Sequence, residues 1–262
     1  MRILLHPGFH KTGTSSLQRG AMARADDLAP HLRVLLTPDI IKAARAARRY
    51  STTRSPDLLA RFSDHFQTSI TSQSRDDPRA LLISSEDLGG ALPGLSGVGT
   101  YDAAPDLMLA ASSALRAHFG AQAQITIWFT TRETGPWLKS LYWQNLRAHR
   151  LVDDFETFRD QFAPAADLDR IVTNTHATVG DQALVTATAL ETIAQHRAGP
   201  LGAALDLLDI PSQTLAPLGA HNLQPADAAE ALLALNRSEI DDASLKDAKR
   251  ELLRMYRRNR LA

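Results

Sequence analysis

Three short apolar runs, each ending in a cluster of small polar residues, constrain the fold of this chain more than any other feature. They cover residues 2–5, 80–83 and 125–129. Each is short and rich in aliphatic, branched or aromatic residues, which is typical of a strand buried on both faces. Helical patterns fill the chain between them, and strands that alternate with helices favour a parallel sheet. We therefore expect a three-layer α/β fold with a central, mostly parallel sheet flanked by helices.

The remaining sequence adds one ambiguous strand and four clear helical patterns. Residues 184–189 carry three β-branched side chains and fit either a strand or a helix. The helical patterns cover residues 105–119, 137–149, 201–208 and 244–258. Residues 89–106 hold five glycines and two prolines, which predicts a flexible loop. No repeat or low-complexity linker divides the chain, so residues 1–262 are expected to form a single domain.

Composition excludes several classes of protein. The chain has no cysteine, which excludes disulfide frameworks, thiolate metal sites and a cysteine nucleophile. Its 29 basic and 29 acidic residues give a formal net charge of zero, which argues against general nucleic-acid binding. No apolar run approaches the roughly 18 residues needed to cross a bilayer, and no signal-peptide pattern follows Met1. We therefore expect a cytoplasmic protein without an integral membrane segment.

The turn at residues 6–16, His-Pro-Gly-Phe-His-Lys-Thr-Gly-Thr-Ser-Ser, joins the first apolar run to a helical pattern. Gly8 and Gly13 permit backbone angles and close approaches that a Cβ would block. A helix that starts near Thr14 directs free N–H groups toward an anion, and Lys11 adds a full charge. Nucleotide hydrolases have the loop G-x-x-x-x-G-K-[ST], with lysine where this chain has Thr14. The turn is thus expected to bind phosphate, but not with the Mg²⁺-nucleotide geometry of those enzymes.

The sequence Lys-Thr-Gly-Thr-Ser at residues 11–15 resembles the 5′-phosphosulfate loop of sulfotransferases, which use 3′-phosphoadenosine 5′-phosphosulfate (PAPS). Sulfotransferases also place an arginine at the end of the third strand and a serine eight positions later, and these hold the 3′-phosphate. Arg132 and Ser140 have this spacing, and residues 132–144 look like bacterial members of the family. The resemblance implies a P-loop sulfotransferase fold and PAPS as co-substrate. The nucleotide-binding residues that it implies are Lys11, Thr12, Gly13, Thr14, Ser15, Arg132 and Ser140.

The second apolar run ends in Ser84, Ser85, Glu86 and Asp87. In an open parallel sheet the reacting groups gather outside the carboxyl ends of the strands. Cytosolic sulfotransferases carry a catalytic histidine at this strand end, and several carbohydrate sulfotransferases use a glutamate base. We therefore predict that Glu86 is the catalytic base, with Ser84 or Ser85 as hydrogen-bonding partners of substrate or sulfate. Asp87 is the next candidate, and a helix-capping role for Glu86 stays open.

The resemblance implies that the chain transfers a sulfuryl group from PAPS to an acceptor hydroxyl. Lys11 would neutralise the charge that forms on the bridging oxygen, and no metal would be required. The glutamate base favours a carbohydrate acceptor, whereas the sequence sets neither the acceptor's identity nor the oligomeric state. Two alternatives stay open: a nucleotide hydrolase or kinase with a degenerate phosphate loop, and a non-catalytic nucleotide-binding module.

Three other groups of residues have two interpretations each. His6 and His10 flank the turn without the pattern of a metal site, and His10 is expected to contact an anion or pack the turn. Residues 42–54 carry five cations and no acid, which fits an anion-binding surface or a solvated helix face. The arginines at 257 and 258 would replace the family's C-terminal Arg-Lys-Gly loop or simply favour a helix end.

The helical pattern after Arg132 also makes specific predictions. Thr134 is expected to cap this helix and Trp137 to lie in the core. Tyr142 or Trp143 is expected beside the nucleotide or acceptor pocket.

Overall fold

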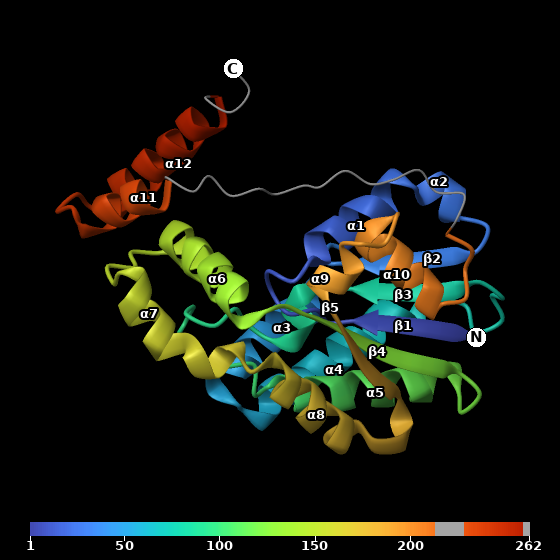
Figure 1. The fold of residues 1–262 in the computed structure, drawn as a ribbon. Helices are drawn as coiled ribbons and strands as arrows, with labels where there is room; N and C mark the ends of the chain where they lie inside the picture. Colours follow the sequence, from blue (N-terminus) through green and yellow to red (C-terminus); the bar gives the residue numbers. More distant parts are fainter. Residues whose placement is uncertain (213–227, 259–262) are drawn as a thin grey trace.

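The computed structural model describes residues 1–212 and 228–258, and the chain forms a five-stranded sheet within them (Figure 1). The strand order is β2-β3-β1-β4-β5, and every neighbouring pair is parallel. The strands are β1 (Arg2–His6), β2 (Leu32–Leu36), β3 (Ala80–Ser84), β4 (Gln124–Thr131) and β5 (Leu184–Ala189). The expected α/β fold with a central parallel sheet is therefore confirmed.

Helices cover both faces of the sheet (Figure 1). One face carries α1 (Thr14–Ala23), α2 (Ala25–Leu28), α9 (Leu190–Ile193) and α10 (Gly199–Leu207). The larger core on the other face involves α3 (Ile41–Thr53), α4 (Pro56–Thr71), α5 (Ala104–Phe119), α6 (Thr134–Ala148), α7 (Phe155–Phe162) and α8 (Leu168–Val179). The last two described helices, α11 (Ala228–Arg237) and α12 (Asp242–Arg258), pack on each other beside α6.

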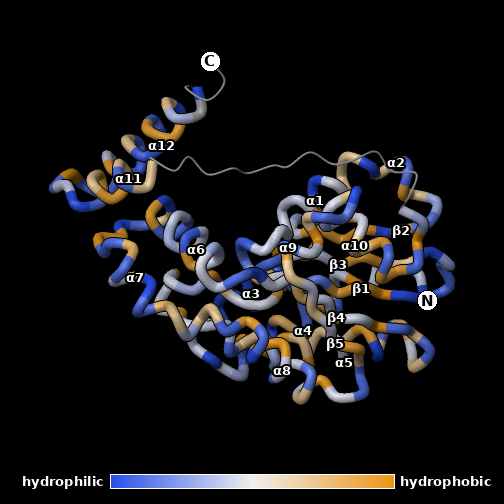
Figure 2. Tube along the Cα trace, viewed as in Figure 1, coloured by the Kyte–Doolittle hydropathy of each residue, from blue (hydrophilic) through white to orange (hydrophobic). Residues whose placement is uncertain are grey.

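β1 illustrates how the sequence builds two cores from one strand. Successive side chains of a strand point to opposite faces. Ile3 and Leu5 join the larger core, whereas Leu4 packs with Leu17 of α1 and Leu201 of α10 in the smaller one. Figure 2 shows hydrophobic residues concentrated along the strands in the middle of the molecule. Burial on both faces is why β1 appears in the sequence as a continuous apolar run.

Four of the five strands follow the sequence expectations. β1, β3 and β4 contain the three apolar runs and extend them by one to three residues, and the ambiguous residues 184–189 form a strand. β2 was not predicted, because its five residues, Leu-Arg-Val-Leu-Leu, are interrupted by Arg33 and resemble a short helical segment. The four expected helices are present as α5, α6, α10 and α12, with ends shifted by one to three residues.

The connections that follow β1 and β4 leave the sheet on opposite faces. The chain after β1 passes over one face of the sheet as α1 and α2, whereas the chain after β4 passes over the other face as α6, α7 and α8. Ligands of open α/β sheets bind outside the carboxyl ends of the strands at the point where the connections diverge in this way. In Figure 1 this edge of the sheet lies toward α3 and α6.

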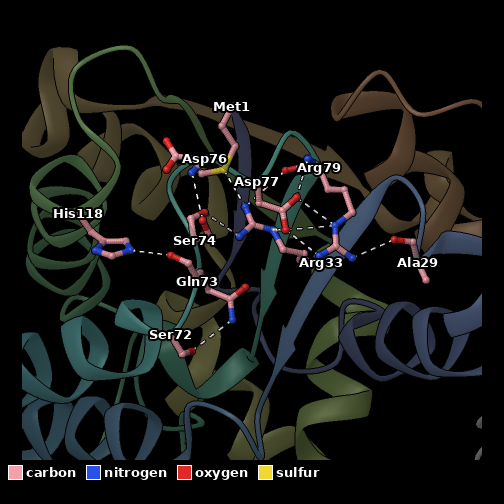
Figure 3. A network of polar contacts seen from close by, with 10 residues as sticks. All are labelled: Met1, Ala29, Arg33, Ser72, Gln73, Ser74, Asp76, Asp77, Arg79 and His118. Carbon is pink, nitrogen blue, oxygen red and sulfur yellow. Dashed lines mark hydrogen bonds and ion pairs between the residues drawn. The ribbon is translucent and has the colours of Figure 1, made fainter.

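The opposite, amino-terminal edge of the sheet is fastened by a polar network (Figure 3). Arg33 of β2 donates to Ser74 O at 3.1 Å and contacts the Asp77 carboxylate at 3.5 Å. Arg79 donates to the same carboxylate at 2.7 Å and to Ala29 O at 3.0 Å. The hydrogen bonds from Arg79 hold the pKa of Asp77 well below its usual range. This network therefore joins β2, the turn before β3 and the end of α2.

The predicted cap of α6 needs correction, and the predicted loop after β3 is partly packed. The helix α6 begins at Thr134, but its N-cap is Glu133, and no side chain caps the helix. The glycine-rich segment after β3 starts as a 3₁₀ helix, η1 (Glu86–Gly89), and residues 88–93 are buried. Asn145 of α6 donates to the carbonyl of Pro93 at 3.1 Å. Residues 90–103 form neither helix nor strand, as expected of a loop, and the start of this loop is packed against α6.

The pair α11 and α12 is anchored on α6 by polar contacts. The amine of Lys249 is buried and donates to Leu146 O at 2.6 Å and to His149 O at 2.8 Å, at the end of α6. Burial lowers the pKa of Lys249 to about 8. Asn236 of α11 donates to Leu151 O at 2.8 Å. Among the helices of residues 1–212 and 228–258, none is long and apolar enough to cross a membrane.

Candidate active site

The turn between β1 and α1 has the shape of an anion cradle. Gly8 and Gly13 have φ of +52° and +108°, which side chains other than glycine rarely adopt. A Cβ on Gly8 would lie 2.4 Å from Thr14 Oγ1, and a Cβ on Gly13 would lie 2.9 Å from Leu190 Cδ1. Both glycines are therefore required by backbone angle and by space, as the sequence pattern indicates.

The start of α1 leaves polar groups available inside this cradle. The N-cap is Gly13, so no side chain caps the helix, and the first N–H groups of a helix have no partner within it. Thr14 is 1% exposed, and its hydroxyl oxygen is buried without a hydrogen-bond partner among the described residues. A buried hydroxyl without a partner costs about 1–3 kcal/mol. The site therefore contains a donor that no described residue uses.

A buried hydrogen-bond network supports the turn from below. Thr12 Oγ1 donates to Phe9 O at 2.6 Å and lies 2.6 Å from Thr130 Oγ1 at the end of β4. Thr130 Oγ1 is 3.4 Å from His6 Nε2, and His6 Nδ1 is 2.9 Å from Ser84 Oγ. Burial lowers the pKa of His6 to about 3, so its ring is neutral near pH 7. The hydroxyl of Thr12 thus holds the turn, which leaves its backbone as the part that can face a ligand.

Lys11 is held at the rim of the turn in an uncommon conformation. Its φ of +70° lies in the left-handed region, which costs a residue other than glycine about 1–3 kcal/mol. Arg132, at the end of β4, donates to Lys11 O at 3.2 Å, and Lys11 Nζ is 3.5 Å from Gln144 Oε1 of α6. The strained backbone is therefore fixed from β4, and the amine is aimed toward α6.

The electrostatic surroundings of Lys11 are mixed, with cations in excess. Burial lowers the pKa of Lys11, the carboxylate of Glu86 opposes this shift, and the guanidinium groups of Arg147 and Arg132 add to it. The partly buried amine therefore faces one carboxylate and two cations. An anion placed among Lys11, Arg132 and Arg147 would restore the charge balance and favour the protonated amine.

Glu86 and Asp87 follow β3 but have different surroundings. Asp87 is engaged, since its Oδ1 lies 3.5 Å from His10 Nε2 and 3.7 Å from Arg48 Nε. Glu86 opens η1, is half-buried, and its carboxylate forms no hydrogen bond or ion pair in the part of the chain that the structure describes. Glu86 is thus the carboxylate at this strand end that remains available to a ligand.

The two serines before Glu86 are buried. Ser84 Oγ contacts His6, as described above, and Thr37 Oγ1 donates to Ser85 Oγ at 2.9 Å. Gln18 of α1 donates to Ser84 O at 3.0 Å. Both serines therefore position the carboxyl end of β3 rather than lying open to a substrate.

His10 belongs to a second hydrogen-bonded group beside the turn. Its backbone N–H donates to Tyr101 Oη at 3.1 Å, and Nδ1 lies 3.0 Å from the same oxygen. Burial raises the pKa of Tyr101 well above its ordinary value, so Tyr101 keeps its proton and can donate it to Nδ1. We therefore assign the His10 ring proton to Nε2, facing Asp87. Trp137 Nε1 donates to His10 O at 3.0 Å, which fixes the same residue from α6.

One face of α6 closes the site. Ser140 is buried on this helix, and Gln144 and Arg147 follow it by one and two turns, both interacting with Lys11. The sequence pattern predicts a role for Ser140 but none for Gln144 or Arg147. Their spacing of four and three residues on a predicted helix was the signal that could have identified them.

The structure thus brings Lys11, Thr12, Gly13, Thr14, Ser15, Glu86 and Arg132 together at the carboxyl edge of the sheet. Ser140 belongs to this site because it lies on the same face of α6 as Gln144 and Arg147. The expectations for the aromatic residues of α6 are met in part. Trp137 is in the core as expected, but Tyr142 donates to Asp153 O and packs on Phe158, so it belongs to the core between α6 and α7.

One expectation lies partly outside the described chain. The side chain of Arg257 is not among the described residues, so its suggested part in nucleotide binding is untested. Within residues 1–212 and 228–258, no three His, Asp or Glu side chains gather in a way that could hold a metal ion.

Comparisons with known proteins give little further guidance. No protein-family model matches the sequence, and no curated protein matches it. Among solved structures, the chain is similar to a sulfotransferase from Alicyclobacillus acidocaldarius, with 15% identity, 94% of each chain covered and a TM-score of 0.45. A likeness of this strength carries no conclusion about activity, which the residues at the sheet edge must supply.

Proposed function

We propose that this chain transfers a sulfuryl group from PAPS to an acceptor hydroxyl. The observation that carries the proposal is the buried, unpartnered hydroxyl of Thr14 inside a turn that needs glycine at positions 8 and 13. Such a turn at a helix N-terminus suits the 5′-phosphate of a nucleotide. Lys11 precedes the second glycine, as in the 5′-phosphosulfate loop that this turn resembles.

The loop residues would bind the 5′-phosphate and stabilise the leaving group. The N–H groups at the start of α1 and the hydroxyls of Thr14 and Ser15 would donate to phosphate oxygens, and Thr12 would contribute its backbone. Lys11 would neutralise the charge that develops on the phosphate oxygen as its bond to sulfur breaks. Gln144, 3.5 Å from the amine, would keep Lys11 directed at that oxygen.

Glu86 would act as the base. As the acceptor oxygen forms its bond to sulfur, its proton passes to the Glu86 carboxylate, and the bond from sulfur to the 5′-phosphate oxygen breaks. The carboxylate is half-buried, lies near Lys11 and has no partner in the described chain that would compete for the proton. A positioned base of this kind contributes about 10²–10⁴-fold to the rate.

Arg132 and Ser140 would hold the 3′-phosphate. This assignment rests on the resemblance, supported by the place of Arg132 at the carboxyl end of β4 and of Ser140 on the α6 face that borders Lys11. A charge-assisted hydrogen bond contributes about 1.5–3 kcal/mol, so Arg132→Ala should weaken binding of the 3′-phosphorylated nucleotide about tenfold or more. Binding of ADP, which lacks the 3′-phosphate, should change far less.

The proposal is tested by following the sulfuryl group. Purified protein with ³⁵S-labelled PAPS and a panel of hydroxyl acceptors, including sugars, should give labelled product with and without EDTA. Lys11→Ala should abolish that transfer, and Glu86→Gln should reduce it by about 10²-fold or more. Wild-type rates in both variants, or Mg²⁺-dependent turnover of ATP in place of PAPS, would refute the proposal.

A further inference from the structure

The basic segment of the sequence forms the helix α3, and this helix stays at the carboxyl edge of the sheet. α3 begins at Ile41, after a turn that starts at Thr37, whose hydroxyl donates to Ser85 just after β3. It ends beside the first turn of α5, where Tyr50 and Arg54 contact Asp106. Both ends of α3 thus adjoin elements that start or finish at this edge.

The exposed side of α3 carries charges of one sign. Its buried positions are alanines and Tyr50, whereas Lys42, Arg45, Arg48 and Arg49 are exposed. The three residues other than Arg48 make no side-chain hydrogen bond or ion pair with the residues that the structure describes. Residues three, four and seven apart share one helix side, so these cations form a stripe about 10 Å long.

The stripe leads to the proposed active site. Arg48 Nε lies 3.7 Å from Asp87, the neighbour of Glu86, and Ser51 Oγ accepts a hydrogen bond from Ala91 N just after η1. Two acids lie near the stripe, but neither pairs with Lys42, Arg45 or Arg49 among the described residues. Asp87 forms an ion pair with Arg48 alone of these cations, and the Asp39 carboxylate accepts a hydrogen bond from the backbone N–H of Leu36. Cations so close on one helix side repel each other, which an anionic ligand would relieve.

We infer that α3 binds the acceptor, and that the acceptor is an anionic glycan whose carboxylate or sulfate groups pair with Lys42, Arg45 and Arg49 while one of its hydroxyls reaches Glu86. This inference rests on the proposed function and names the substrate class of the same site. The chain as a whole has no net charge, so the stripe is a local feature of this edge rather than a consequence of a basic composition.

A glycan fits these observations better than an acidic peptide. Peptides are recognised through apolar grooves, free strand edges or pockets for side chains. The exposed side of α3 presents cations, Thr52 and Thr53, with no exposed aliphatic or aromatic residue. A linear sugar acid carries a charge and several hydroxyls on every unit, so charge pairing along α3 leaves hydroxyls free for transfer.

The test compares an anionic with a neutral linear oligosaccharide of similar length. Oligogalacturonate and maltohexaose, both linear chains of six α-linked hexoses, are titrated without nucleotide into wild-type protein, the variant Lys42→Gln/Arg45→Gln/Arg49→Gln, and the control Arg75→Gln/Lys246→Gln. The control removes exposed cations that lie away from α3. Oligo-glutamate and an oligodeoxythymidine of equal charge are titrated alongside.

We expect oligogalacturonate to bind wild type and control alike, more weakly at higher salt, and about tenfold more weakly to the α3 variant. The α3 variant should keep the thermal shift caused by 3′-phosphoadenosine 5′-phosphate, the product nucleotide, because its substitutions do not touch the loop. Equal affinity in the α3 variant, equal binding of maltohexaose, no binding of oligogalacturonate, or tighter binding of oligo-glutamate or the oligonucleotide would each overturn the inference. Failure of the proposed function would appear separately, as the absence of that nucleotide shift in wild-type protein.

Discussion

At the scale of single residues, the hydroxyls of two threonines in the turn have opposite effects on the stability of the free protein. The Thr14 hydroxyl is buried without a partner among the residues that the structure describes, whereas the Thr12 hydroxyl has Phe9 O and Thr130 Oγ1 at 2.6 Å. Both are nearly inaccessible to solvent. A hydroxyl kept unpaired in the free protein is expected where a ligand supplies the partner.

This contrast predicts opposite effects for one substitution at two positions. Thr14→Val should raise the free energy of unfolding by about 1 kcal/mol and weaken binding of 3′-phosphoadenosine 5′-phosphate about fivefold or more. Thr12→Val should lower the free energy of unfolding by about 1–3 kcal/mol. Denaturant unfolding and calorimetric titration measure both quantities. Destabilisation by Thr14→Val, with unchanged nucleotide affinity, would show that its hydroxyl has another role.

Lys11 should affect the chemical step more than binding. Lys11→Met keeps most of the side-chain volume and removes the charge, and we expect kcat for sulfuryl transfer to fall about 10²–10³-fold. The dissociation constant of the product nucleotide should rise by a smaller factor. Lys139→Met, on the exposed side of α6, is the matched control and should leave both unchanged. An unchanged kcat with weaker nucleotide binding would instead assign Lys11 to binding alone.

His6 makes stability depend on pH. Its pKa is about 3 in the folded protein because of burial, against an ordinary value near 6.5, so the unfolded chain binds a proton that the folded protein excludes. This contribution to stability is complete above about pH 6.5 and is lost as the pH falls toward 3, by up to about 1.4 kcal/mol per pH unit.

His6→Asn should flatten the fall in stability between pH 6.5 and 4, whereas His31→Asn, at an exposed position, should leave the slope unchanged. Thermal unfolding at a series of pH values measures this slope. A slope in His6→Asn as steep as that of the wild type would contradict the buried, neutral histidine.

At the scale of elements, two glycines in the segment after β3 show how closely this segment packs on α6. Gly94 has φ of +91°, and a Cβ there would lie 2.3 Å from Asn145 Oδ1 of α6. Gly97 has φ of +77°, but a Cβ there would meet no atom within 4 Å. The two glycines therefore both have a positive φ, which would strain any other residue, but only Gly97 has room for a Cβ.

Gly94→Ala should destabilise the protein by about 3 kcal/mol, since it adds overpacking to backbone strain. Gly97→Ala carries the strain alone and should cost about 1–2 kcal/mol. Because Asn145 lies next to Gln144, Gly94→Ala should also weaken nucleotide binding. Similar unfolding midpoints for the two variants would indicate that the segment is not packed on α6.

The sequence predicts elements well where one local pattern determines them. The runs that form β1, β3 and β4 are continuous and apolar because both faces of each strand are buried. The turn after β1 is predictable because few turns require two glycines in these positions between a strand and a helix. β2 was not predicted because Arg33 interrupts an otherwise apolar run of five residues. The guanidinium of Arg33 donates a hydrogen bond to Ser74 O at the amino-terminal edge of the sheet. The rigid packing of residues 88–93 depends on Asn145, which is 52 residues from Pro93 in sequence.

The same reasoning separates the predictable and unpredictable parts of the site. Lys11, Arg132 and Glu86 follow strands directly, so the rule that ligands bind at carboxyl ends finds them. Gln144 and Arg147 reach Lys11 from inside α6, and the His6–Ser84–Thr130 network joins three strands. Such contacts depend on the strand order, which periodicity does not give.

At the scale of the whole molecule, a neutral chain concentrates cations on one edge of its sheet. Lys11, Arg132 and Arg147 surround the turn, and the α3 stripe extends the same sign beyond it. The excess cations of this edge are offset by acids elsewhere in the chain, since the totals balance. An edge of this kind attracts anions from solution without making the protein generally basic.

The central claim is that this edge binds a 3′-phosphorylated adenine nucleotide, and thermal unfolding tests it most directly. At about 100 times its dissociation constant, 3′-phosphoadenosine 5′-phosphate should add about 2.7 kcal/mol and raise the midpoint by about 5 °C or more. The account predicts this shift with EDTA present, a smaller shift with ADP, and a shift reduced by Arg132→Ala. An equal shift with ADP, or one that appears only with Mg²⁺ and ATP, would contradict it.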